Sequence, residues 1–81
     1  MPRYDSGWVD IAREQYLGLP EDLRRLIDAR ITQLLDGPDG PGTSHDPQTD
    51  WWTTTDSAGA GLIVYVFRPG RPRLVILRLV Y

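Results

Sequence analysis

Apolar residues recur at helical spacing through the first half of the chain. Residues 8–19 place four of them on one helical face, and residues 20–37 place six along one broad stripe. Pro20 is suited to a first helical turn, and Gly37 is typical of a helix end. Because a short Gly-Leu-Pro turn joins the two stretches, the sequence predicts a helical hairpin. The apolar positions are Val9, Ala12, Tyr16 and Leu19, then Leu23, Leu26, Ile27, Ile31, Leu34 and Leu35.

The second half of the chain changes to a strand pattern. Residues 51–56, 61–67 and 73–81 are rich in β-branched, aromatic and aliphatic side chains, and Arg-Pro-Gly-Arg-Pro between the last two suits a hairpin end. They predict a three-stranded antiparallel meander. The expected fold class is α+β, a single domain over residues 1–81 whose N-terminal helical hairpin packs on a small antiparallel sheet. A short edge strand at residues 3–8 is a further option.

A polar stretch, residues 37–50, connects the two halves. It contains three glycines, three prolines and three acidic residues, so little in it can pack in a core. It is long for a structureless connection inside a compact domain. The stretch is therefore either a mobile surface loop or a functional loop, and its composition favours the first.

The last strands are apolar on both faces, which an antiparallel sheet packed on one side should not be. Strict alternation puts Val75, Leu77, Leu79 and Tyr81 on one face and Leu74, Ile76, Arg78 and Val80 on the other. A helical hairpin covers one face only, so we expect another chain, as an oligomer or a hetero-complex, to cover the second. The alternative is that the 37–50 stretch and the two tryptophans fold over it. The interface residues expected are Leu74, Ile76, Val80, Trp51 and Trp52.

Charge is divided unevenly along the chain. Residues 1–56 contain all eleven acids and five arginines, a balance of −6, whereas residues 57–81 contain four arginines and no acid, a balance of +4. Such a division is the electrostatic signature of an anionic partner, although four arginines also keep a hydrophobic sheet in solution. Arg68, Arg71 and Arg73 cluster at one hairpin end and are the residues expected to contact the target.

Composition excludes several kinds of chemistry. The chain has no cysteine, and its one histidine, His45, with scattered aspartates has no metal-ligand spacing, so neither a metal nor a cofactor is expected. The N-terminus lacks the apolar run of a signal peptide and no segment has the length of a membrane span, which favours a cytoplasmic protein without a membrane partner.

Three stretches carry a resemblance to the RelE/ParE superfamily of small bacterial toxins. Residues 4–20 resemble its opening strand, first helix and Leu-Pro turn, and residues 21–38 resemble its second helix and closing Gly-Pro. Residues 61–81 resemble its last two strands. The resemblance implies a type II toxin that a cognate antitoxin binds and neutralises. It also implies one of two activities, cleavage of messenger RNA on the ribosome or inhibition of DNA gyrase by binding.

The ribonuclease site of the RelE-like members does not carry over residue by residue. Ile63 stands where their Gly-Tyr-Arg-Val strand has arginine, and residues 51–56 contain no cation. The nearest catalytic candidates are Arg78, Tyr81 and Tyr65, with Arg73 and His45 as further members of an unusual site. Three hypotheses stay open: a toxin that acts by binding, a ribosome-dependent endoribonuclease, and an inactive relative that serves as an interaction module.

Overall fold

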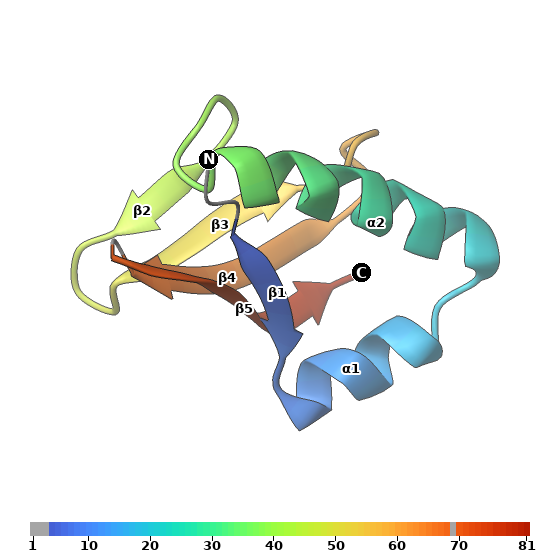
Figure 1. Ribbon diagram of the computed structural model, residues 1–81. Helices are drawn as coiled ribbons and strands as arrows, with labels where there is room; N and C mark the ends of the chain where they lie inside the picture. The colour runs from blue at the N-terminus through green and yellow to red at the C-terminus, as the bar shows by residue number, and fades with distance from the viewer. Residues whose placement is uncertain (1–3, 69) are drawn as a thin grey trace.

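The computed structural model describes residues 4–68 and 70–81. In this part of the chain two helices pack with one sheet, and α2 crosses over one face of it (Figure 1). The elements in chain order are β1 Asp5–Trp8, α1 Asp10–Leu17, α2 Glu21–Asp36, β2 Ser44–Asp46, β3 Trp51–Thr55, β4 Leu62–Arg68 and β5 Arg71–Val80.

The sheet corrects the expected fold class. It has five strands in the order β1-β5-β4-β3-β2, and it is mixed, because β1 pairs parallel to β5 while the other pairs are antiparallel. A parallel pair needs a long crossover, and here both helices and three strands lie between its members. The small antiparallel meander is thus β3-β4-β5 alone, extended by β1 at one edge and β2 at the other. The optional edge strand lies at Asp5–Trp8; Arg3, at the start of the expected range, is outside the described residues.

The helices do not act as the expected hairpin that covers the sheet. The helix α1 packs along β5, and α2 contributes Ile27, Ile31 and Leu34 to the core beneath it. A hydroxyl-to-carboxylate hydrogen bond from Tyr16 to Asp28, 2.8 Å long, links the two helices at the surface. Each helix therefore packs chiefly on the sheet.

The core lies between α2 and one face of the sheet. Its strand residues share that face because β5 contains an irregularity: Val64 pairs with Arg78 and Tyr65 with Ile76, which leaves Leu77 as an extra residue. The shift moves Leu79 to the covered face, where strict alternation had not placed it. The buried apolar residues are Ala12, Ile27, Ile31, Leu34, Ile63, Tyr65, Leu74, Ile76 and Leu79.

The connection after α2 is held to the rest of the fold by hydrogen bonds and by strand pairing. Arg30 donates to Thr54 Oγ1 at 2.9 Å and to the Pro41 carbonyl at 2.8 Å, so it ties the connection to α2 and β3. The Tyr65 hydroxyl donates to the Pro38 carbonyl from inside the core. The second part of the connection forms β2, which pairs with β3. Composition alone could not show this, because the residues that hold the segment lie outside it.

Candidate functional site

An open cleft lies where the β2–β3 turn meets the end of β4. Its volume is about 440 Å³. It combines a histidine, two aromatic rings, an arginine and two carboxylates, and no other hollow described in the structure has this range of chemistry. The lining residues are Asp39, His45, Asp50, Trp52, Phe67 and Arg68.

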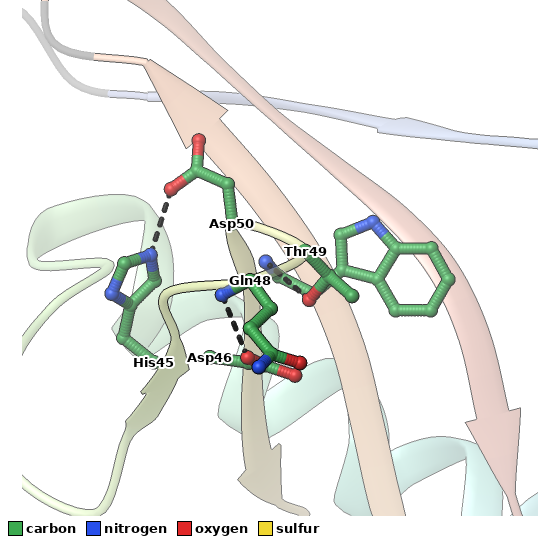
Figure 2. A network of polar contacts seen from close by, with 6 residues as sticks. His45, Asp46, Gln48, Thr49 and Asp50 are labelled. Atoms are coloured by element: carbon green, nitrogen blue, oxygen red, sulfur yellow. Dashed lines mark hydrogen bonds and ion pairs between the residues drawn. The ribbon is translucent and has the colours of Figure 1, made fainter.

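The β2–β3 hairpin positions the histidine. His45 is the cross-strand partner of Trp52, and the two rings pack with centroids 4.7 Å apart. The turn that follows is closed by two hydrogen bonds: the Asp50 amide donates to the Asp46 carbonyl at 2.8 Å, and the Gln48 amide donates to Asp46 Oδ1 at 2.9 Å. The closed turn brings the Asp50 carboxylate back over β2 (Figure 2).

His45 and Asp50 form a direct pair at the rim of the cleft. Their Nε2 and Oδ1 atoms are 2.7 Å apart, and the ring's second nitrogen points away from Asp50 (Figure 2). The His45 side chain is 35% exposed, so it is anchored on one side and open to solvent on the other. A residue so placed can exchange a proton with a bound ligand.

Aromatic rings form the floor of the cleft. Trp52 packs against Phe67 at 5.1 Å and lies 6.5 Å from Tyr65, with the two ring planes 28° apart. Tyr4 packs against Phe67 in an edge-to-face contact, with the ring centroids 5.7 Å apart. Trp52 is only half-buried, so part of its indole surface is available to a flat ligand.

The expected target-binding arginines lie beside this cleft. Arg68 lines it, and Arg71 stands opposite Arg68 across the β4–β5 hairpin. Arg73 lies over Gly7 on β1, where a Cβ would be only 2.6 Å from its Nη2 atom. The same three arginines line a hollow of about 150 Å³. We call Arg68, Arg71 and Arg73 the arginine hairpin.

None of these arginines has an ion pair within residues 4–68 and 70–81. Like charges directly opposite each other on paired strands destabilise a sheet, and Arg68 and Arg71 are so placed. An anion bound between them would relieve that repulsion. The hairpin end therefore favours a negatively charged ligand.

The three expected catalytic residues do not meet. Tyr65 is fully buried, and burial raises the pKa of its hydroxyl to about 12. Arg78 pairs with Val64 away from the core. Tyr81 lies at the opposite end of β3 and β4 from the cleft, where its hydroxyl donates to Asp56 Oδ2 at 2.6 Å. Burial and Asp56 raise the pKa of Tyr81. They form no common site in this structure.

The five expected interface residues do not form one surface either. Leu74 and Ile76 are buried in the core, so a partner cannot reach them, and Trp52 belongs to the cleft. Trp51 and Val80 are 45% and 47% exposed. Val80 belongs to the uncovered side of the sheet, which we call the outer face and define as Leu62, Val64, Val66, Val75 and Val80.

Sequence reasoning missed Asp50, Phe67 and Asp39 as members of a site. The available signal was the polar-aromatic pairing of Ser-His-Asp with Trp-Trp across a short turn, which would have placed His45 beside Trp52. Reading the whole 37–50 stretch as one loop hid that hairpin. Phe67 could not be assigned before the register of β4 was known.

No protein-family model matches the chain, and neither a curated protein nor a solved structure resembles it at a significant score. Residues 4–68 and 70–81 contain no cluster of three or more histidine or acidic side chains able to hold a metal ion. Neither helix in that part of the chain has the length and apolar character needed to cross a membrane.

Proposed function

We propose that this chain is a growth-inhibiting toxin that cleaves RNA at the cleft around His45. The observation that carries the proposal is the convergence in one open cleft of an anchored imidazole, a half-buried indole and a guanidinium with no ion pair in residues 4–68 and 70–81. Cleavage of an RNA strand needs a proton acceptor, a cation beside the phosphate and a means to hold the nucleotide still.

The parts of the cleft divide these tasks. Trp52 offers a flat surface on which an unpaired base stacks, a contact worth about 1–3 kcal/mol per base. Arg68 supplies a positive charge at the rim of the cleft. Arg71 and Arg73 continue the positive charge beyond the cleft, where the phosphates of the adjoining nucleotides would lie.

The chemistry follows from the atoms that RNA provides. His45 takes the proton of a 2′-hydroxyl, and the 2′-oxygen attacks the adjacent phosphorus. The bond from phosphorus to the 5′-oxygen breaks, that oxygen takes a proton from water, and the hydroxide left behind takes up the proton that His45 had removed. The products are a 2′,3′-cyclic phosphate and a 5′-hydroxyl end, and Arg68 stabilises the charge that builds up on the phosphate oxygens.

Two observations support a toxin that a partner protein neutralises. The three stretches that resemble the RelE/ParE superfamily form a strand and helix, a second helix, and two paired strands. The outer face exposes Leu62 and Val80 to 40% and 47%, and its other members, Val64, Val66 and Val75, are partly buried. A partner antitoxin would cover such a face. We further propose that the substrate is messenger RNA on the ribosome.

The test is expression of the chain and of His45→Ala in a bacterial host, with growth and RNA fragments as readouts. The natural chain should arrest growth and leave fragments with 2′,3′-cyclic phosphate ends, and His45→Ala should lose at least about 100-fold in cleavage. The control is Arg25→Ala, because in the described part of the chain Arg25 forms its ion pair with exposed Glu21 on α2.

A second candidate function is arrest by binding alone. The arginine hairpin continues into an apolar surface through Val66 and Val75, a combination that suits a protein target such as DNA gyrase. If His45→Ala arrests growth as strongly as the natural chain and plasmid supercoiling falls, this reading replaces the nuclease. Normal growth with the natural chain would contradict both and leave an interaction module.

A further inference from the structure

The contact between His45 and Asp50 determines which imidazole nitrogen is free. An ionised carboxylate only accepts hydrogen bonds, so in the neutral ring Nε2 must carry the proton at a distance of 2.7 Å. Nδ1 has no hydrogen-bond partner in the described part of the chain and points away from Asp50 (Figure 2). Nδ1 is therefore the nitrogen with an available lone pair.

The backbone at Asp50 is unusual. Its φ is +61°, and no other non-glycine residue in the described ranges has a positive φ. This left-handed conformation is disfavoured for residues with a Cβ, although aspartate tolerates it better than most. The turn maintains it through the hydrogen bond from the Asp50 amide to the Asp46 carbonyl.

Stability does not explain why aspartate occupies this position. The Asp50 side chain is 75% exposed, and ion pairs in that setting contribute little to folding. Glycine would adopt the same φ without strain. What aspartate adds is a carboxylate aimed at Nε2 of the histidine.

We propose that Asp50 is a positioning residue that holds His45 as the Nε2–H tautomer and so directs Nδ1 to the 2′-hydroxyl of bound RNA. The inference rests on the proposed function and deepens it, since it names the atom that accepts the proton. Trp52 fixes the ring from one face, with centroids 4.7 Å apart, and Asp50 fixes its rotation from the edge.

The tautomer can be measured without any assay of activity. His45 is the only histidine in the chain, so its two ring nitrogens give unambiguous ¹⁵N NMR signals. In the natural protein at a pH where the ring is neutral, the protonated nitrogen should be Nε2. In Asp50→Asn the amide can donate instead of accept, so the population should move toward Nδ1–H. In Asp50→Gly both tautomers should be populated.

Steady-state kinetics and the melting temperature then distinguish a positioning role of Asp50 from a structural one. In Asp50→Gly the melting temperature should stay level or rise, because the left-handed φ is relieved, while kcat on a model RNA falls about 10- to 100-fold and KM stays within about two-fold. The control is Asp46→Asn, which keeps an oxygen for the Gln48 amide; the Asp46 side chain makes no hydrogen bond to the His45 ring in the described part of the chain.

Two results would overturn the assignment. One is an Asp50→Gly variant with an unchanged kcat, and the other is a ring tautomer that is the same with and without the carboxylate. A natural chain that cleaves no RNA would defeat the proposed function, and the catalytic role of Asp50 would fall with it. The NMR result would then still decide whether Asp50 sets the tautomer.

Discussion

At the scale of single residues, the Asp56 carboxylate accepts four hydrogen bonds. It is 2% exposed, and it accepts hydrogen bonds from the amides of Ala58, Ala60 and Gly61 and from the Tyr81 hydroxyl. The Tyr81 ring lies so close over Gly61 that a Cβ there would be 2.4 Å from it. Asp56 thus joins the β3–β4 turn to the residue after β5.

Replacement of Asp56 should destabilise the protein. In Asp56→Ala three turn amides and one hydroxyl lose their acceptor, so we expect the free energy of unfolding to fall by about 2–3 kcal/mol. Urea denaturation measures this loss. The matched control is Asp46→Ala, which removes one exposed hydrogen bond and should cost less than about 1 kcal/mol.

Asp56 also makes stability depend on acid. Burial alone would raise the pKa of this carboxyl, but the hydrogen bonds from Tyr81 and the turn amides outweigh it and hold the pKa below 3.8. Because the folded pKa is depressed, its contribution is complete above about pH 4 and is lost as pH falls through the folded pKa. In Tyr81→Phe one of these hydrogen bonds is absent, so the acid-dependent part of the stability should shrink. A set of urea midpoints between pH 2 and pH 6, in about half-unit steps, would show whether it does.

At the scale of elements, the free edge of β5 is protected by a side chain. The strand β1 pairs with β5 only as far as Ile76. Beyond that point the Gln15 amide donates to the Leu79 carbonyl at 2.8 Å and accepts from the Leu79 amide at 2.9 Å. A glutamine on α1 therefore satisfies the edge as a further strand would.

Removal of this contact should loosen the edge of the sheet. Gln15→Ala leaves two backbone groups of Leu79 to water, and we expect a loss of about 1–2 kcal/mol with faster hydrogen exchange at the Leu79 amide. Gln48→Ala, whose side chain makes no hydrogen bond in the described part of the chain, is the control. Equal exchange rates in the two variants would show that Gln15 does not protect the edge.

The irregularity in β5 makes a second prediction about neighbouring residues. Leu79 is 3% exposed and Val80 is 47% exposed. Leu79→Ala should therefore cost about 2–4 kcal/mol of unfolding free energy, and Val80→Ala less than about 1 kcal/mol. Urea denaturation of both variants checks the assignment, and a larger cost at Val80 would mean that the faces are exchanged.

The same irregularity separates what the sequence predicts from what it does not. Helical periodicity found α1 and α2 within two residues at each end, because an apolar stripe is local information. The faces of β5 were misassigned because alternation assumes an unbroken strand, and the extra residue Leu77 depends on pairing with β4. The cleft around His45 was not predicted for the same reason: its residues come together only through the pairing of β2, β3 and β4.

At the scale of the whole molecule, three of the four arginines in residues 57–81 come together in space. The arginine hairpin lies at one end of the β4–β5 pair, with no ion pair inside the described ranges. Such arginines bind a phosphate backbone largely through the release of counterions, so binding should weaken as salt rises.

Removal of the arginine hairpin should change this salt dependence. For Arg68→Ala, Arg71→Ala and Arg73→Ala combined, the slope of log K against log salt concentration for single-stranded RNA should shrink by about 2, since each phosphate contact contributes about 0.7. Fluorescence anisotropy at several salt concentrations measures it, with Arg25→Ala as the control. An unchanged slope would place the RNA elsewhere on the surface.

The parallel pairing of β1 with β5 has a consequence for folding during synthesis. Asp5 pairs with Arg73, which lies near the other end of the chain. The strand β1 therefore cannot join the sheet until the residues of β5 have emerged from the ribosome. The strand β5 also carries Leu74, Ile76 and Leu79 of the core. A nascent chain that lacks β5 cannot close this core, so the fold should form only after β5 has left the ribosome.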